Sequence, residues 1–314
     1  MAVTPLRVVF AGTPEVAVPS LRALVASEHE VVGVIARPDA PTGRGRRMRA
    51  CPVAEVAREL SIPLTQPASL TADSIDAQLR HWRPDVVIVV AYGLLIPGRL
   101  LEIPRFGWVN AHFSALPRWR GAAPVQYAIA AGDESVTVTT FRIDEGLDTG
   151  PVLASSEPIA IGDRDDSGRL LTHLADVAAR LVVSTVDQLA AGTAASTPQE
   201  TEGVSYAPRI GTDDARIDWS RPVDEVDRWI RACTPSPGAW TTFAGTRIRI
   251  GTPRGVIHGS STPRQIITEK HRVLVGAADG FLDLGMVQPM GKQEMAASDW
   301  ARGLREAAPG EFDA

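Results

Sequence analysis

The sequence predicts an α/β protein in which a Rossmann-like, mainly parallel sheet is followed by a small β-barrel. Over the first 190 residues, short apolar runs alternate with stretches of helical periodicity, which is the pattern of βαβ units. A small, polar segment over 191–207 then separates this part from a series of short strand-like segments. We therefore expect a first domain over 1–190, a linker over 191–207 and a second domain over 208–314.

The first domain opens with an apolar strand over 7–11. A helix over 15–26 follows, and it begins at Thr13-Pro14 because proline suits the first turn of a helix. The run 86–91 is apolar at every position, as expected of a central strand that is buried on both faces. The other strands that we expect are 31–36, 108–110 and 137–141, and the other helices are 52–60, 73–82, 124–131 and 166–190.

The second domain begins with a predicted amphipathic helix over 222–232. Its apolar residues Val223, Val226, Trp229 and Ile230 fall on one face at helical spacing. Short strands follow at close intervals, which is typical of a small barrel. These strands are expected over 239–243, 247–251, 265–268, 272–275 and 281–287.

Composition places the chain among ordinary globular proteins, with 314 residues, 44% hydrophobic and 22% charged. Cys51 and Cys233 lie too far apart for a metal or redox motif, which favours a reducing compartment. The longest uncharged apolar run, 86–97, is too short to span a bilayer, and the first residues read as a strand rather than a signal peptide. We therefore expect a cytoplasmic protein without a membrane partner.

The net charge of −5 argues against a general nucleic-acid binder, yet one segment is strongly basic. The stretch 37–49 holds five arginines and a single acid, Asp39. Its prolines and glycines exclude a helix, so it is interpreted as a loop that can meet phosphate groups. A solvated loop with scattered arginines is the alternative, because the chain has only two lysines and uses arginine as its usual cation.

The expected sheet lacks the phosphate-binding loops of nucleotide enzymes. Its first βα turn reads Ala11-Gly12-Thr13-Pro14-Glu15 instead of G-x-G-x-x-G, and no G-x-x-x-x-G-K-[ST] occurs. A different ligand should therefore bind at the carboxyl ends of the strands, in the turns that follow 91 and 110.

Asn110-Ala111-His112 carries the strongest chemical signal. Side chains two residues apart on a strand point to the same face, so an amide and an imidazole can both reach one point. Asp148 lies in Gly146-Leu147-Asp148-Thr149-Gly150, where the glycines permit a tight turn. Two hydrogen-bond donors for an oxyanion and a group that handles a proton are suited to acyl transfer. The structural alternative is a capping asparagine, a core histidine and a turn aspartate.

Besides Asn110-Ala111-His112, five stretches form a recognisable set: Phe10-Ala11-Gly12-Thr13-Pro14, Val89-Val90-Ala91-Tyr92-Gly93-Leu94-Leu95, Leu116-Pro117-Arg118-Trp119-Arg120-Gly121-Ala122-Ala123-Pro124, the Asp148 turn and Gly291-Lys292-Gln293-Glu294-Met295. In order and spacing these motifs resemble those of the methionyl-tRNA formyltransferases, and the match extends over nearly the whole chain. The Asn-x-His pair and the distant Asp are shared by the wider family that takes formyl from 10-formyltetrahydrofolate. The Arg-Trp-Arg-Gly-Ala-Ala-Pro run, the basic loop and the C-terminal half select the transfer-RNA branch. Phe113 and Ala115 depart from the usual His-x-Ser-Leu-Leu-Pro pattern.

The resemblance implies a formyltransferase fold with an OB-like second domain, and formyl transfer from 10-formyltetrahydrofolate to the amine of initiator methionyl-tRNA. Asn110 and His112 would donate to the oxyanion, and Asp148 would orient His112 and help to relay the proton. We expect a monomer that needs no metal ion. The expected folate-binding residues are Tyr92, Gly93, Leu94, Leu95, Ser114, Ala115, Leu116, Pro117 and Asp144. The expected tRNA-binding residues are Arg44, Arg46, Arg47 and Lys292.

Three other functions use the same features. A formyltransferase acting on a sugar amine or small nucleotide would keep the catalytic residues without using the basic loop or the barrel. A hydrolase would release formate from the same folate. A non-catalytic RNA-binding protein would keep the sheet only as a scaffold, but it would have no need for Asn110, His112 and Asp148 together.

Overall fold

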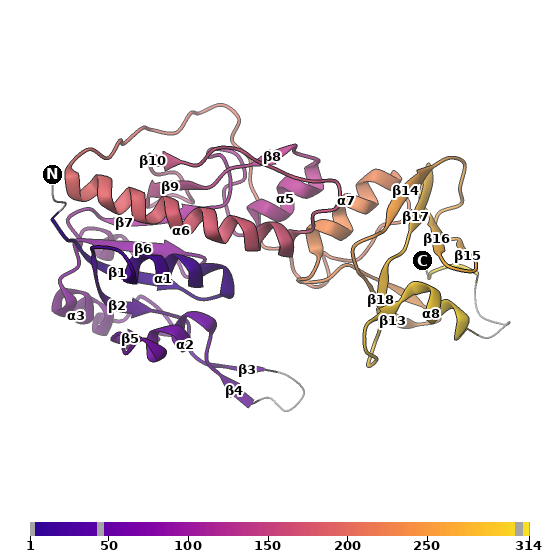
Figure 1. Ribbon diagram of the computed structural model, residues 1–314, viewed down its shortest axis with the longest axis horizontal. Coiled ribbons are helices and arrows are strands. Elements are labelled where there is room, and N and C mark those ends of the chain that lie inside the picture. The colour runs from indigo at the N-terminus through magenta and orange to yellow at the C-terminus, as the bar shows by residue number, and fades with distance from the viewer. Residues whose placement is uncertain (1–3, 43–46, 305–309, 314) are drawn as a thin grey trace. The chain divides into compact units, whose positions relative to one another are not determined.

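The computed structural model describes residues 4–42, 47–304 and 310–313, which form two compact units. One unit comprises Met1–Pro124, Val136–Ile159 and Leu171–Ala207, and the other comprises Val125–Ser135, Ala160–Leu170 and Pro208–Ala314. Two short segments that precede residue 171 therefore group with the C-terminal residues. A mainly parallel sheet with helices is followed by an antiparallel, strand-rich domain, so the expected fold class is confirmed (Figure 1).

The first unit is built on a seven-stranded sheet with the order β10-β9-β7-β6-β1-β2-β5. The five strands from β7 to β5 are parallel, and β9 and β10 add antiparallel pairs at one edge. From β1 the chain continues to β2 and β5 on one side of β1, and then crosses back to form β6 and β7 on the other side, so the strand order reverses at β1. Ligands bind in such sheets at this reversal, outside the carboxyl ends of the strands. The strands are β1 (Arg7–Gly12), β2 (Glu30–Ile35), β5 (Leu64–Thr65), β6 (Val86–Val90), β7 (Trp108–His112), β9 (Thr139–Arg142) and β10 (Val152–Ser155).

Helices cover the sheet and bury its apolar side chains. The helix α3 packs Ile75, Leu79 and Trp82 against alternate residues of β1 and β6, such as Val9 and Val87. Side chains on one face repeat every two residues along a strand and about every 3.6 residues along a helix, so these residues meet in one layer between α3 and the sheet. The helices of the first half are η1 (Glu15–Ala17), α1 (Val18–Val25), α2 (Pro52–Glu59), α3 (Asp73–Trp82), α4 (Gly98–Leu101), α5 (Pro124–Ala131) and α6 (Ser167–Ala191).

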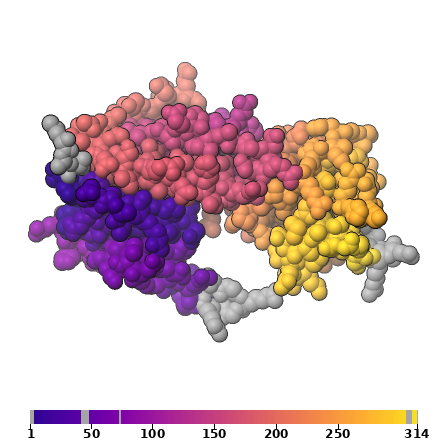
Figure 2. All heavy atoms as spheres, in the orientation of Figure 1, coloured from indigo at the N-terminus to yellow at the C-terminus, as the bar shows by residue number. Residues whose placement is uncertain are grey.

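The long helix α6 is tied to the sheet by two polar contacts. Thr185 shares a hydrogen bond of 2.9 Å with Thr140 of β9, and Asp187 lies 3.0 Å from Nε2 of His29. His29 Nδ1 accepts the Leu6 amide, so Nε2 is the nitrogen that donates to Asp187. His29 is thus a satisfied structural histidine, while the outer side of α6 lies at the surface in Figure 2.

Several elements differ from the sequence expectation. The strand expected over 137–141 is found as β9, and a short strand that was not expected, β8 (Ser135–Val136), precedes it and pairs with β11 (Ile159–Ala160). The basic segment, interpreted as a loop, holds a hairpin of β3 (Ala40–Thr42) and β4 (Arg47–Arg49), and its tip lies outside the described residues. The pairing of β8 with β11 depends on residues distant in the sequence, which local periodicity does not report.

The second unit contains two four-stranded antiparallel sheets, with the orders β12-β13-β18-β19 and β14-β17-β16-β15. Its core includes Trp219 and Phe312, whose rings stack at 5.5 Å, with Phe243 and Trp300 against them. Nowhere in the described ranges is a helix long and apolar enough to cross a membrane. The elements are α7 (Val223–Cys233), β12 (Trp240–Phe243), β13 (Thr246–Ile250), β14 (Gly255–His258), β15 (Ile266–Thr268), β16 (Val273–Gly276), β17 (Gly280–Asp283), β18 (Met286–Pro289), β19 (Met295–Ala296) and α8 (Ala297–Arg302).

Candidate active site

The strand β7 carries Asn110 and His112 at the carboxyl edge of the parallel sheet. Asn110 pairs with Val89 of β6 on one side and with Phe141 of β9 on the other, and His112 pairs with Thr139. Because the two side chains are separated by one residue, they lie on the same face of the strand, as expected. His112 is buried and Asn110 is half-buried. Within the part of the chain that the structure describes, the Asn110 carboxamide has no hydrogen-bond partner.

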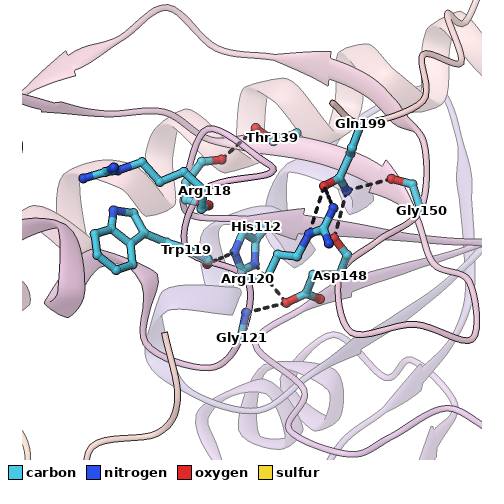
Figure 3. Close-up of polar contacts among 10 residues, drawn as sticks. His112, Arg118, Trp119, Arg120, Gly121, Thr139, Asp148, Gly150 and Gln199 are labelled. Carbon is cyan, nitrogen blue, oxygen red and sulfur yellow. Dashed lines mark hydrogen bonds and ion pairs between the residues drawn. The ribbon is translucent and has the colours of Figure 1, made fainter. Parts of the chain in front are cut away.

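His112 has a polar group beside each ring nitrogen. Nε2 lies 2.8 Å from the carbonyl oxygen of Trp119, and Nδ1 lies 3.8 Å from Oδ2 of Asp148 (Figure 3). A carbonyl only accepts hydrogen bonds, so Nε2 carries the hydrogen in the neutral ring. The Nδ1 lone pair then faces the carboxylate, and a separation of 3.8 Å is too long for a hydrogen bond. A proton that arrives at Nδ1 would therefore be stabilised by Asp148.

Burial lowers the pKa of His112 below the usual 6.5, while the Asp148 carboxylate and the Trp119 carbonyl act in the opposite direction. Asp148 is the charged group that faces the ring among the described residues. The other close neighbour is the edge of the Phe141 ring, whose centroid lies 6.3 Å from that of the imidazole. The free protein therefore favours a neutral imidazole at neutral pH, ready to accept a proton.

The Asp148 turn is shaped by its own backbone. Asp148 has a φ of 53°, a left-handed conformation that aspartate tolerates better than most residues, and its Oδ2 accepts the Gly121 amide at 2.7 Å. Gly150 is required because an added Cβ would lie 1.7 Å from the carbonyl oxygen of Arg142. Asp144 Oδ1 accepts the Gly146 amide and the Thr149 hydroxyl, so this carboxylate closes the same turn.

Arg120 and Gln199 complete the frame of the site, and sequence reasoning did not identify their role. The Gln199 side chain donates to the carbonyl oxygens of Asp148 and Gly150, each at 2.8 Å, and accepts two hydrogen bonds from the Arg120 guanidinium (Figure 3). Arg120 belongs to a motif that carried the family resemblance, but Gln199 lies in the segment expected to be the linker. Nothing in its local sequence indicates that it contacts the Asp148 turn.

Residues 205–207 also pack on the site. The Arg120 amide donates to the Ser205 carbonyl, the Ala207 amide donates to the Arg120 carbonyl, and the Trp119 amide donates to the Ser205 hydroxyl. The two main-chain bonds form a short parallel β-bridge between Arg120 and Tyr206, beside the loop that contacts His112 and Asp148. The end of the expected linker is thus joined to the first unit by main-chain hydrogen bonds.

The expected folate loop follows β6 at the point where the strand order reverses. The Thr13 hydroxyl at the end of β1 donates to the Tyr92 carbonyl at 3.0 Å, so the two turns lie side by side. Burial raises the pKa of Tyr92 to about 12, and its hydroxyl has no partner among the described residues. Gly93 has a φ of 82° with open space where a Cβ would lie, and Leu95 is 88% exposed. Leu94 packs against the core.

The other expected folate residues follow β7. Ser114 is buried, and its hydroxyl donates to the Arg118 carbonyl at 2.6 Å, so it holds the loop together. Ala115 is exposed, and Leu116 and Pro117 are half-buried and joined by a cis peptide bond. A contact of these residues and of Asp144 with folate remains a prediction.

The residues expected to bind tRNA fall in different parts of the chain. Arg44 and Arg46 lie outside the described residues, and Arg47 begins β4. Lys292 is exposed in the second unit, where its carbonyl accepts a hydrogen bond from Gln288.

A second basic feature of that unit was not singled out from the sequence. The Arg247 guanidinium lies 3.5 Å from the centre of the Trp240 ring, and Arg249 follows on the same face of β13. In the ranges that the structure describes, no group of three or more His, Cys, Asp or Glu side chains is arranged to hold a metal ion.

The comparisons with known proteins identify the class of enzyme. A formyl transferase family model matches residues 6–186, and a model of the formyl transferase C-terminal domain matches residues 209–305. The chain therefore belongs to the formyl transferase family, and the family expected from its motifs is confirmed.

Two relatives match this chain at about half identity over nearly their full length. The chain is 52% identical over 303 residues to the methionyl-tRNA formyltransferase of Nocardioides sp., covering 96% of each chain. It is 53% identical over 302 residues to that of Thermobifida fusca, covering 96% of this chain and 97% of the relative.

Solved structures share the fold at low sequence identity. HypX from Aquifex aeolicus in complex with tetrahydrofolic acid matches 96% of this chain with a TM-score of 0.67 and 17% identity. The match covers 47% of HypX, so this chain spans about half the length of that protein. WlaRD, a sugar 3N-formyl transferase solved in the presence of dTDP and 5-N-formyl-THF, matches 92% of this chain and all of its own, with a TM-score of 0.64 and 17% identity.

Proposed function

We propose that this chain transfers the formyl group of 10-formyltetrahydrofolate to the free amine of methionyl initiator tRNA. The observation that carries this proposal is the placement of Asn110, His112 and Asp148 together at the carboxyl edge of the sheet, with Asp148 3.8 Å from His112. The folate supplies an activated formyl group at this edge, and the side chains supply hydrogen bonds and a proton acceptor.

Asn110 is assigned as the first donor to the negative charge that develops on the formyl oxygen. Its half-buried carboxamide has no partner in the described parts of the chain, so donation breaks no existing hydrogen bond. His112 already donates its Nε2 hydrogen to Trp119. An imidazole N–H is fixed in the plane of its ring, so His112 becomes a second donor only by rotation of the whole ring, which would also move Nδ1 from Asp148; in the orientation seen here it is placed to accept a proton.

His112 Nδ1 is assigned as the atom that accepts the proton from the attacking amine and returns it to the folate nitrogen as the bond between that nitrogen and the formyl carbon breaks. Its lone pair is available in the neutral ring, and Asp148 stands beside it to stabilise the imidazolium. The Trp119 carbonyl and the Gly121 amide keep the ring and the carboxylate in this relation. General base catalysis of this kind contributes roughly 10²–10⁴ in rate.

The turn after β6 fits a flat, hydrogen-bonding pterin. The open space at Gly93 leaves room for a ring beside the main chain, and Leu95 presents an exposed apolar surface. Tyr92 itself is buried and neutral, so it supports the turn from within. We assign pterin binding to the main-chain groups of this turn, with the 114–117 loop and Asp144 at its border.

The acceptor is proposed to be initiator tRNA because the relatives at about half identity carry that name over nearly their full length. Arg44, Arg46 and Arg47 in the basic segment 37–49, and Lys292 in the second unit, would contact phosphates. Arg247 on Trp240 adds a cationic and aromatic surface suited to RNA. We propose that the protein acts as a monomer in the cytoplasm, where its tRNA partner is used.

The test is to incubate the protein with formyl-labelled 10-formyltetrahydrofolate and charged initiator tRNA. Label in formylmethionyl-tRNA, and its loss in His112→Ala, is the expected result. Free labelled formate would instead indicate a hydrolase, and label on an added amino sugar would indicate the sugar-amine alternative. No reaction with any acceptor would contradict the proposal.

A further inference from the structure

We infer that Gln199, together with Arg120, is a positioning residue that holds Asp148 in place for proton transfer. This inference rests on the proposed function of the same site. It concerns a residue from the segment that the sequence suggested is only a connection between domains. The closed set of contacts in Figure 3 is the observation that carries it.

Gln199 uses all the hydrogen-bonding capacity of its amide. The two hydrogens of Nε2 meet the carbonyl oxygens of Asp148 and Gly150, and Oε1 meets Nε and Nη2 of Arg120 at 3.1 and 2.7 Å. The opposite orientation would place oxygen against two carbonyls and nitrogen against a guanidinium, which only donates. The amide orientation is therefore determined by its partners.

Asp148 is held at both of its ends by the same short loop. Its carboxylate accepts the Gly121 amide, and its carbonyl accepts Gln199, which in turn is bound by Arg120, the neighbour of Gly121. The other neighbour, Trp119, accepts Nε2 of His112. Residues 119–121 thus hold both partners of the pair. The Trp119 carbonyl holds the His112 ring, the Gly121 amide holds the Asp148 carboxylate, and the Arg120 side chain holds the Asp148 carbonyl through Gln199.

The burial of Arg120 explains why its guanidinium depends on Gln199. Only 9% of this residue is exposed, and no carboxylate lies within salt-bridge distance of it in the described parts of the chain. Buried charges need hydrogen-bond partners, and Gln199 Oε1 is the side-chain acceptor for two of its donors. Arg120 requires an acceptor, and the carbonyls of Asp148 and Gly150 require two donors. The glutamine amide supplies all of these without adding a charge.

The variant Gln199→Glu distinguishes two roles for Gln199: positioning Asp148, or only anchoring the segment around residue 199 to Arg120. The carboxylate would keep, and even strengthen, the bond to Arg120, but it has no hydrogen for the carbonyls of Asp148 and Gly150 and would repel them. If Gln199 only anchors the segment to Arg120, this variant should have normal activity. If it positions Asp148, kcat should fall roughly 10-fold to 100-fold with little change in KM for tRNA.

Gln199→Met is the second variant, because it keeps the length of the side chain and removes both kinds of contact. Glu200→Gln is the matched control, since Glu200 is the exposed neighbour and takes no part in the network. Both Gln199 variants should lower kcat, and the control should match the wild type. In an Asp148→Asn background, Gln199→Met should cost less than about 2-fold, because residues that act as a unit are not additive. Independent losses that multiply would overturn the inference.

A measurement that needs neither folate nor tRNA completes the test. The His112 ring is titrated by NMR, with its signal assigned by loss in His112→Ala. Gln199→Met should move the His112 titration to lower pH because Asp148 no longer supports the charged ring, and Glu200→Gln should leave it in place. An unchanged titration in Gln199→Met overturns the inference even if the wild type formylates tRNA. A shifted titration supports it even if no formylation is found, an outcome that would overturn the proposed function alone.

Discussion

Asp148→Asn is the substitution that most directly tests the proposed proton transfer. The asparagine oxygen can still accept the Gly121 amide, and the Asp148 carbonyl is unchanged, so the turn should keep its shape. What disappears is the negative charge 3.8 Å from His112 Nδ1. Because Oδ2 faces both the Gly121 amide and Nδ1, the asparagine oxygen takes this position and the NH2 group replaces the other carboxylate oxygen.

The size of the effect follows from the distance. Two unit charges about 4 Å apart interact by about 4 kcal/mol at an effective dielectric constant of ~20. That is the stabilisation of the imidazolium that the variant loses, and the partial exposure of Asp148 reduces it. Since each 1.4 kcal/mol is about tenfold in rate, we expect kcat to fall by roughly 10²–10³.

The assay is steady-state formylation of charged initiator tRNA across pH. In the wild type, activity should fall on the acidic side as His112 becomes protonated and can no longer act as a base. Removal of Asp148 should lower the pKa of His112 further, so the acidic limb should move to lower pH in the variant.

Asp187→Asn is the matched control, because Asp187 forms a similar pair with His29 away from the site. It should change kcat by less than about twofold, since it lies outside the catalytic frame and surface contacts are worth little. If Asp148→Asn retains a kcat within threefold of the wild type, as the control should, Asp148 does not stabilise a charged His112.

Other predictions follow from the same structure. Asn110→Ala should lower kcat by about 10²–10³ with unchanged thermal stability, because it removes an oxyanion donor whose side chain has no partner in the described structure; a near-normal kcat would remove it from the mechanism. Replacing Arg44 and Arg46 by Ala should weaken tRNA binding and reduce the slope of log K against log salt by about one unit per lost phosphate contact, while folate binding, measured separately, stays unchanged. An unaltered slope would place tRNA recognition elsewhere. Denaturant melts should show stability falling as pH drops below about 6.5, because the unfolded state then binds the proton that buried His112 resists; His112→Ala should flatten this dependence, and an identical slope in both proteins would contradict the assignment.

Local sequence was sufficient for most of the main helices and strands and for the placement of Asn110 and His112 on one strand face. The helix expected over 73–82 has those bounds, and the apolar run after 85 forms β6 at the centre of the sheet. Asn110 and His112 share a face because the period of a strand is two, which no distant residue needs to specify. Strand β14 was missed because GVIH is mostly exposed and short, and β8 was missed because it is two residues long and its partner β11 lies elsewhere in the chain.

The sequence by itself determined the chemical groups of the site: an amide and an imidazole on one strand, and an aspartate in a glycine-bounded turn. Tertiary structure alone decided that Asp148 faces Nδ1, that Nε2 is occupied by Trp119, and that Gln199 braces the aspartate from a segment that reads as a linker. The physical reason is the range of the interactions. Side-chain periodicity acts over a few neighbouring residues, whereas a buried guanidinium and a turn carbonyl find their partner wherever folding brings one within hydrogen-bonding distance.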